Sequence, residues 1–369
     1  MSLRLFESVK QMKAYTDPGK NTYDALIDDF EEGMTQNVID EVFADIKREL
    51  IPLVKEIVAK SATNVPQFYE YADVNKQKEW SRILLEYIGF DFNRGTIAES
   101  EHPFTLNLST KDVRITNHYY PNNLMSAFYT IIHEGGHGIF EQNVNEEFDD
   151  TSLTSCQFMG IHESQSRFFE NILGRNINFW KPIMNKLQED FPQFKDVTLD
   201  EFNREINHIE NSLIRVDADE LTYCFHIILR YELERDLLNG KLAVKDLPKA
   251  WNEKMQKYLS ITPTTDSEGV LQDSHWSGAA FGYFPAYLLG SIYDGMFLDV
   301  VQDKFGKVDE ILAKGEIQTI TKWLNEKIHQ YGSSRLPMEV IEEVCHKPLT
   351  AEPFIRYAKE KYTKIYGLD

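Results

Sequence analysis

The chain has 369 residues, of which 42% are hydrophobic and 12% aromatic, and it carries a formal net charge of −20 at pH 7. This apolar content is typical of a globular protein, and no run approaches the roughly 18 uninterrupted apolar residues of a membrane span. The N-terminus lacks a secretory signal pattern, so we expect a soluble, cytoplasmic protein with no membrane partner. The negative charge makes nucleic acid an unfavourable partner. An odd number of isolated cysteines argues against a disulfide framework: Cys156, Cys224 and Cys345.

In the first third of the chain, the spacing of hydrophobic residues changes once, from a helical pattern to strand-like alternation. Thr35 is a candidate cap for an amphipathic helix to about residue 57, which contains Pro52, and a second helix is expected near 77–89. Residues 105–108 and 112–120 are then rich in Thr, Ile, Val and Tyr with partial alternation. This pattern predicts two short strands.

The rest of the chain has helical patterns. We expect helices over roughly 124–142, 155–175, 198–240, 244–260, 284–304, 316–331, 337–346 and 351–366. Thr198 and Glu201 match a capping box at the start of the long 198–240 helix. No repeat or linker marks a domain boundary. The sequence therefore predicts one domain over 1–369, mainly α, with a small sheet beside the 124–142 helix.

That helix contains the most informative motif of the chain, His133-Glu134-Gly135-Gly136-His137. Histidines four residues apart share one helix face, and two imidazoles beside a carboxylate are typical of a zinc site that activates water. The alternative is a pair of surface histidines on an ordinary helix. Two helical glycines, each costing about 1 kcal/mol relative to alanine, favour the metal site.

A hydrolytic zinc site needs a third protein ligand, and Glu163 is the candidate. It lies 26 residues beyond His137 in the segment HESQSR, His162 to Arg167. That span suits a helix, a loop and the start of a second helix that packs back on the first. The alternative is a solvated carboxylate near a helix start.

Six segments in order resemble the metallocarboxypeptidases of the carboxypeptidase Taq type. They are HPF (His102 to Phe104), DVRIT (Asp112 to Thr116), HEGGH (His133 to His137), HESQSR (His162 to Arg167), IRVDAD (Ile214 to Asp219) and GVLQDSHW (Gly269 to Trp276). The resemblance extends from about residue 23 to the C-terminus. It implies a zincin-like helical metallopeptidase, mainly α, with a small antiparallel β-sheet beside the active-site helix and a deep substrate groove.

The resemblance also implies the roles of the residues in the motif. His133, His137 and Glu163 would bind Zn²⁺, and Glu134 would be the general base that takes a proton from water and passes it to the leaving amine. Two imidazoles and a carboxylate also suit Co²⁺ or another divalent cation. Members of the family form homodimers, which we carry over as an expectation.

The developing oxyanion needs a further donor. Related helical zinc peptidases use a histidine and a tyrosine from a late segment, which makes His275 and Tyr283 the catalytic candidates. His275 lies in an unusually polar stretch, and Asp273 is a candidate to orient it. The alternative for Tyr283 is a core aromatic with a satisfied hydroxyl.

An exopeptidase that removes the last residue of a peptide must recognise a free carboxylate, which a guanidinium binds with two parallel hydrogen bonds. Arg215 is the first candidate and Arg114 the second. The alternative for both is internal ion pairing with nearby aspartates. His102 is a further candidate for substrate contact, or it holds a loop in place. Arg167 and His162 are expected to support the metal ligands.

The chain departs from the family in one respect, because the zinc motif arrives at residue 133 and part of the family's N-terminal helical region is expected to be absent. Three functions stay open. The first is a carboxypeptidase acting on peptides with a free C-terminus. The second is a related oligoendopeptidase, and the third is a catalytically impaired fragment that binds metal and peptide.

Overall fold

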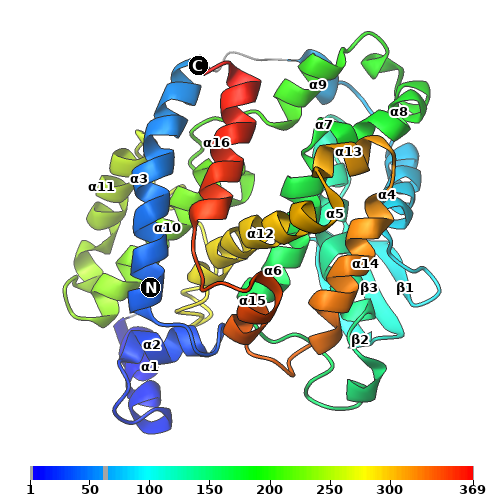
Figure 1. Ribbon diagram of the computed structural model, residues 1–369. Helices are drawn as coiled ribbons and strands as arrows, with labels where there is room; N and C mark the ends of the chain where they lie inside the picture. Colours follow the sequence, from blue (N-terminus) through cyan, green and yellow to red (C-terminus); the bar gives the residue numbers. More distant parts are fainter. Residues whose placement is uncertain (1–2, 61–64, 369) are drawn as a thin grey trace.

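The computed structural model describes residues 3–60 and 65–368, and most of them lie in helices (Figure 1). The described residues before the strands form helices joined by short loops. They comprise α1 (Leu3–Thr16), α2 (Thr22–Asp28), α3 (Gln36–Lys60), the short 3-10 helix η1 (Pro66–Tyr69) and α4 (Val74–Ile88). The two helices predicted here are confirmed as α3 and α4, with Pro52 inside α3. None of the helices in these described ranges is long and apolar enough to span a bilayer.

Three strands form a small sheet next to the helix that carries the two histidines. They are β1 (Gly95–Glu99), β2 (Thr105–Ser109) and β3 (Asp112–Asn117), in the spatial order β1-β3-β2. The central strand β3 buries Val113 and Ile115 completely. Because β3 packs against the following helix, the sheet fixes the position of that helix.

The predicted strand pair is confirmed as the antiparallel pair β2 and β3. The sheet as a whole is mixed, not purely antiparallel, because β1 pairs with β3 in parallel. The sequence analysis did not predict β1. Its five residues, GTIAE, are all at least partly exposed, so they lack the alternation of buried apolar side chains that identifies a strand.

The helices after the sheet follow in one series. In chain order they are α5 (Leu124–Gln142), η2 (Glu146–Phe148), α6 (Met159–Arg167), the π-helix η3 (Phe168–Gly174), α7 (Ile177–Trp180), η4 (Lys181–Ile183), α8 (Met184–Asp190), η5 (Pro192–Phe194), α9 (Leu199–Ile206), η6 (Arg215–Asp217) and α10 (Thr222–Leu238). They continue with η7 (Val244–Asp246), α11 (Leu247–Leu259), α12 (Phe284–Phe305), α13 (Val308–Ala313), α14 (Ile317–Lys327), η8 (His329–Tyr331), α15 (Pro337–Cys345) and α16 (Glu352–Tyr366).

The prediction of one helix over 198–240 is wrong. The capping box at Thr198 forms and starts α9, but the chain leaves the helix after Ile206 and enters α10 only at Thr222. The second start has its own cap, because Asp219 Oδ1 accepts hydrogen bonds from the backbone N–H groups of Leu221 and Thr222 at 2.9 Å each. Similarly, the predicted 155–175 helix is α6 followed by a π-helical turn.

The two glycines of the histidine motif let α5 lie very close to its neighbours. A Cβ on Gly135 would come within 2.6 Å of Ile88 in α4, and one on Gly136 within 2.6 Å of the Gln165 backbone oxygen in α6. A third glycine, Gly290, does the same for α12, where a Cβ would lie 2.9 Å from the Ser164 backbone nitrogen. These contacts stack α4, α5, α6 and α12, so α6 is enclosed between α5 and α12.

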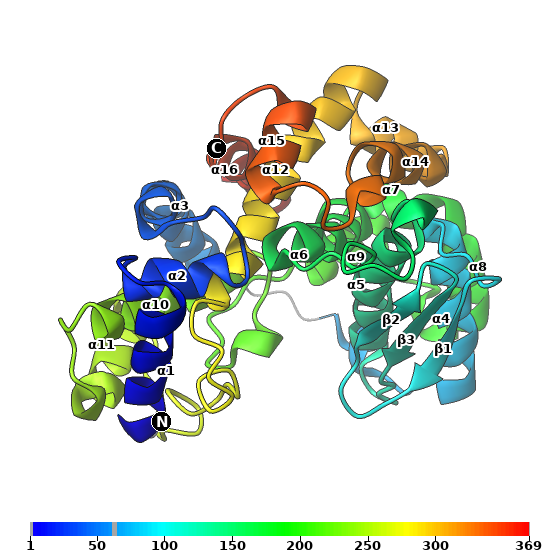
Figure 2. The same cartoon turned by 90° about the horizontal axis from the view of Figure 1, so that it is seen from below.

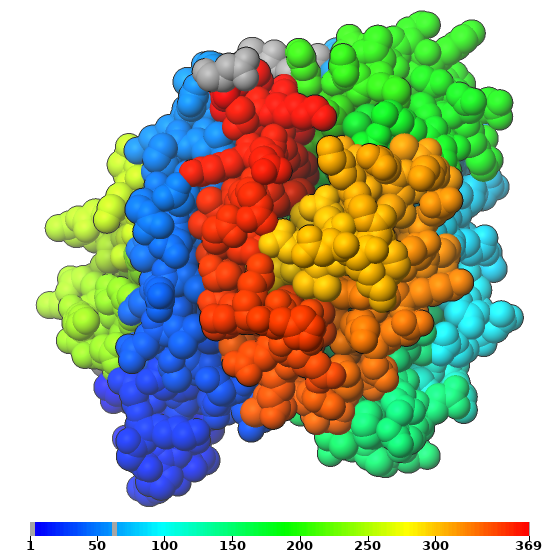
Figure 3. Space-filling model, in the orientation of Figure 1, coloured from blue at the N-terminus to red at the C-terminus, as the bar shows by residue number. Residues whose placement is uncertain are grey.

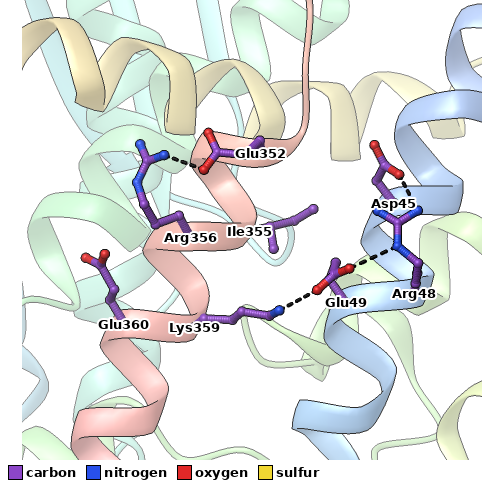
Figure 4. Close-up of a pocket in the computed structure, with 8 residues that line it drawn as sticks. All are labelled: Asp45, Arg48, Glu49, Glu352, Ile355, Arg356, Lys359 and Glu360. Carbon is purple, nitrogen blue, oxygen red and sulfur yellow. Dashed lines mark hydrogen bonds and ion pairs between the residues drawn. The ribbon is translucent and has the colours of Figure 1, made fainter.

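The C-terminal helix α16 runs beside α3 (Figures 1 and 3). A shallow surface hollow between them is lined by charged side chains, including an ion pair of Lys359 with Glu49 (Figure 4). Arg48 pairs with Asp45 at 2.6 Å and with Glu49 at 2.9 Å. These charges pair within the hollow, and exposed pairs of this kind contribute little to stability.

Candidate active site

A cleft of about 880 Å³ contains the histidine motif. One part of its lining, which we call the helical part, consists of α5, α6 and η3. A second part, which we call the arginine part, consists of residues 205–223 and the start of α12. β2, the loop before it and η1 also contribute to the lining. Figure 2 shows α5 on one side and α10 on the other, with α6 and α12 between them.

His133, His137 and Glu163 meet in this cleft. Each offers one ligand atom, and these atoms lie within 4.8 Å of one another. His133 Nε2 and His137 Nε2 are 3.9 and 3.7 Å from the same oxygen, Glu163 Oε2. In a tetrahedral zinc shell with bonds near 2.0–2.1 Å, two ligand atoms are about 3.4 Å apart. Two imidazoles and a carboxylate in this arrangement therefore fit a divalent cation, and a small contraction would bring them to bonding distance.

The second oxygen of Glu163 is held by its own helix. Arg167 Nε donates to Glu163 Oε1 at 2.7 Å, and Ser166 Oγ donates to the Glu163 backbone oxygen at 2.8 Å. Arg167 in turn lies 4.0 Å from the centre of the Tyr223 ring. These contacts leave Oε2 turned toward the two histidines, with Ser166 Oγ 3.4 Å from it.

Each histidine has a different partner behind it. His133 Nδ1 lies 2.9 Å from Glu170 Oε2, whereas His137 Nδ1 lies 2.5 Å from His162 Nδ1. His162 Nε2 continues to Glu141 Oε1 at 2.7 Å. Both motif histidines therefore turn Nε2 toward Glu163 and Nδ1 toward a supporting side chain.

These partners shift the pKa values of the histidines in opposite directions. Burial alone would lower the pKa of His133, but the hydrogen bond to Glu170 and the charge of Glu163 raise it to about 9. Burial and the neighbouring imidazoles of His162 and His133 hold the pKa of His137 well below its usual range.

Glu134 projects from α5 into the cleft, where Thr105 Oγ1 of β2 donates to its Oε2 at 2.7 Å. Burial raises the pKa of this carboxyl, although the charge of His133 acts in the other direction. A carboxyl with a raised pKa is better suited to accept and return a proton near neutral pH.

Arg215 lines the cleft and is buried. Its Nε donates to Asp273 Oδ1 at 2.8 Å, and its Nη1 donates to the Tyr223 hydroxyl at 3.0 Å. Asp273 also accepts from Arg230, which is fully buried. The Gln272 side-chain oxygen accepts from the Arg215 backbone N–H at 2.8 Å. Arg215 is therefore held by the QDSHW segment and connects through Tyr223 to Arg167 and Glu163.

His275 and Tyr283 lie in one aromatic cluster with Tyr287, and the two tyrosines line the cleft. His275 is not among the described residues that line it, and its Nε2 is 3.1 Å from the Tyr287 hydroxyl. Burial and the charge of Arg215 lower the pKa of His275 to about 4. The imidazole is therefore neutral near pH 7, and it contacts the cleft lining through Tyr287.

The two remaining candidates differ in position. His102 is exposed and lines the cleft. Arg114 lies on the exposed face of β3, where its Nη2 pairs with Asp112 at 2.8 Å, and it is not among the described residues that line the cleft. The internal pairing considered for Arg114 is the arrangement that forms.

The sequence analysis did not single out several cleft residues that contact the predicted ones, among them Thr105, Glu170, Tyr223 and Tyr287. Spacing offers a signal for Tyr287, which follows Tyr283 by four residues and so returns to the same helix face. No local pattern identifies Thr105, because its contact with Glu134 joins a strand to a helix.

The model of the carboxypeptidase Taq (M32) metallopeptidase family matches residues 3–362. Carboxypeptidase 1 of Bacillus subtilis is 43% identical over 367 residues, which are 99% of this chain and 73% of that protein. The chain belongs to the carboxypeptidase Taq family. A thermostable carboxypeptidase 1 of Thermus thermophilus is 36% identical over 95% of this chain and 69% of its own length. The chain is thus a metallocarboxypeptidase, and the predicted family and enzyme class are confirmed.

Solved structures support the same conclusion. An M32 carboxypeptidase from Deinococcus radiodurans has a TM-score of 0.95 at 34% identity, covering 99% of this chain and 74% of that one. Metallocarboxypeptidase 1 of Trypanosoma cruzi has a TM-score of 0.92 at 35% identity, covering 97% of this chain and 73% of that one. The predicted mainly helical fold with a small sheet is confirmed, and the family implies a divalent metal.

Proposed function

We propose that this protein is a zinc-dependent metallocarboxypeptidase that hydrolyses the last peptide bond of peptides with a free C-terminus. One observation carries the proposal. The cleft holds both a ligand group of two imidazoles and a carboxylate within 4.8 Å and a buried arginine suited to a terminal carboxylate. Tyr223 connects the two, because it contacts Arg215 through its hydroxyl and Arg167 through its ring.

His133, His137 and Glu163 would hold the cation. Zn²⁺ is the proposed ion because its usual hydrolytic shell has three protein ligands of these types and one open position, although Co²⁺ or another divalent cation suits the same donors. When bound, such an ion polarises the scissile carbonyl and lowers the pKa of water to about 7.

Glu134 is the proposed general base. It accepts a proton from the attacking water at a carboxylate oxygen and later donates it to the leaving amine. Thr105 holds Oε2 by a hydrogen bond, so the carboxylate is oriented before substrate arrives. Glu134 does not belong to the ligand group of His133, His137 and Glu163, which separates its role from that of Glu163.

Arg215 is the proposed anchor for the substrate carboxylate. Nε donates to Asp273, Nη2 lies 2.8 Å from the same aspartate, and Nη1 donates to Tyr223. A guanidinium has five N–H groups, so these contacts leave one N–H on each terminal nitrogen. Two such donors match the two oxygens of a carboxylate.

Tyr283 is the proposed donor to the developing oxyanion, with its hydroxyl kept protonated because burial and the charge of Glu163 raise its pKa. His275 would act by orienting Tyr287 beside it. His102, at the rim of the cleft, is proposed to contact the substrate outside the ligand group.

The test pairs metal analysis with a peptide assay. Purified protein is expected to contain about one zinc per chain and to release the last residue of a short peptide with a free C-terminus. The same peptide with an amidated C-terminus is expected to be cut far more slowly. Equal cutting of both forms would favour the oligoendopeptidase alternative, and bound zinc without turnover would favour the impaired fragment.

A homodimer and a cytoplasmic location remain predictions for this chain. Light scattering of the active protein would test the first, because a homodimer should have twice the chain mass of 43.0 kDa. Peptides are the proposed partners, and nucleic acid is not expected to bind.

A further inference from the structure

A carboxylate that no motif identifies lies directly behind one of the two histidines. We propose that Glu170, held by Arg175, is a positioning residue that fixes the ring orientation and the tautomer of His133 for metal binding. The inference rests on the proposed metal site and adds to it a supporting pair from η3.

The hydrogen bonds determine which ring nitrogen carries the proton. An ionised carboxylate only accepts hydrogen bonds, so the 2.9 Å contact of His133 Nδ1 with Glu170 Oε2 requires the proton on Nδ1. In the neutral ring, which is the form that binds a cation, Nε2 then keeps its lone pair, and it faces Glu163 Oε2 at 3.9 Å. The contact therefore selects the one neutral tautomer that can bind a cation beside Glu163.

Glu170 is itself fixed by Arg175. Arg175 Nη2 pairs with Glu170 Oε1 at 3.1 Å, and its Nη1 donates to the Ile206 backbone oxygen at 2.8 Å. The guanidinium also lies 4.1 Å from the centre of the Tyr129 ring. With contacts to a carboxylate, a carbonyl and an aromatic face, Arg175 has little freedom to move, and it keeps one oxygen of Glu170 turned away from His133.

The π-helical turn explains how two residues five apart come together. The Arg175 backbone N–H donates to the Glu170 backbone oxygen at 2.9 Å, which is the i to i+5 bond of a π-helix. In a regular α-helix, residues five apart point in different directions. The wider turn of η3 brings both side chains toward α5, where His133 is located. Single-turn π-helices are frequent at functional sites for this kind of reason.

His137 has a weaker form of the same support. Its Nδ1 contacts another imidazole nitrogen, His162 Nδ1, and the carboxylate of Glu141 is one imidazole further away. A carboxylate in direct contact with the ligating ring increases its basicity more than a second imidazole does. We therefore expect the support of His133 to matter more for metal affinity than the support of His137.

The test is the zinc affinity of Glu170→Gln, measured by competition with a chromophoric chelator. Gln keeps the size of the side chain, but it removes the charge and can present an N–H to His133. We expect affinity to fall by about 10- to 100-fold. The zinc affinity of Glu141→Gln should fall by a smaller factor.

The matched control is Glu232→Gln. Glu232 is a buried carboxylate paired with Lys47 at 2.5 Å and Lys254 at 2.6 Å, and it is not among the described residues that line the cleft. Its substitution also removes a buried charge, so it should lower the melting temperature of the metal-free protein and leave zinc affinity unchanged. Equal affinity losses in both variants would show a general effect of destabilisation and overturn the proposal.

Arg175→Gln is the second variant if Glu170→Gln does not fold. It leaves the carboxylate in place but unanchored, and we expect a loss of affinity of about 3- to 10-fold. Wild-type affinity in either folded variant would overturn the positioning role. Failure of the wild-type protein to bind zinc at all would instead overturn the proposed function, so the two outcomes are distinguishable.

Discussion

The helical and the arginine parts of the cleft are built in different ways. The helical part holds two ligands four residues apart on α5 and the third on the next helix, α6. In the arginine part, Arg215 lies in the three-residue 3-10 helix η6 between α9 and α10, and it is held by Gln272 and Asp273, more than 50 residues further along the chain. Local helix geometry therefore determines the first part, whereas contacts between distant segments determine the second.

Glu134→Gln should have the largest effect, and it acts on the chemistry of the helical part alone. We expect kcat to fall on the order of 10⁴-fold, the upper range for loss of a general base, with KM and zinc content near wild type. Steady-state kinetics with elemental analysis checks this. If the variant loses zinc, Glu134 is a ligand and the division of roles is wrong.

Arg215→Ala tests the arginine part. Hydrogen bonds to charged groups contribute about 1.5–3 kcal/mol each, so loss of two should lower kcat/KM on free C-termini by about 10³-fold. Amidated peptides should be affected much less. The control is Arg114→Ala, because Arg114 is also paired with an aspartate but is exposed and outside the described cleft lining. A similar loss in both variants would contradict the assignment.

The helical part was largely predictable from sequence. His133 and His137 had to share a face once the apolar spacing predicted a helix, and the two glycines between them indicated close packing, which the structure explains by the nearness of Ile88 and Gln165. The contact of Glu170 with His133 was not predictable, because it depends on a π-helical turn that replaces the expected continuation of α6.

The arginine part shows the limit of such reasoning. A capping box at Thr198 and apolar residues further on predicted one long helix, yet Asp219 starts a second helix and frees the segment that carries Arg215. β1 was missed for a related reason, since its parallel partner β3 is separated from it by β2 in the chain. In both cases the decisive contacts join segments that are distant in the sequence, and the local spacing of apolar residues does not reveal such contacts.

Glu31→Gln tests a residue that connects the two parts. Glu31 is buried, and it accepts hydrogen bonds from the Gly160 backbone N–H at the start of α6 and from the Tyr293 hydroxyl of α12, each at 2.8 Å. The ring of its neighbour Phe30 packs on Tyr283. Burial raises the pKa of Glu31 from 4.5 to about 7.

Because the folded pKa is above the unfolded value, stability from this group is complete below about pH 4.5 and is lost as pH rises to about 7. The loss is up to about 3 kcal/mol at 1.36 kcal/mol per pKa unit. A Gln side chain can accept a hydrogen bond from Gly160 and donate one to Tyr293. The variant should therefore become more stable relative to the wild-type protein as pH rises. Denaturant unfolding of both proteins at pH 5 and pH 8 checks this. The same difference in free energy of unfolding between variant and wild type at both pH values would contradict it.

The smallest expected effect is that of Thr105→Val, which removes the hydroxyl that lies 2.7 Å from Glu134 Oε2 and 3.1 Å from the Glu134 backbone oxygen. A donor to a carboxylate favours its ionised form, so its loss should raise the pKa of Glu134. The acid limb of the kcat/KM profile should therefore move to higher pH by about one unit, since a hydrogen bond to a charged group contributes about 1.5 kcal/mol or more. Thr110→Val is the matched control, because the buried Thr110 hydroxyl donates to Asp149 at 2.9 Å instead. An unmoved acid limb in Thr105→Val would mean that the strand supports the fold but not the base, and the helical part would then act without help from the sheet.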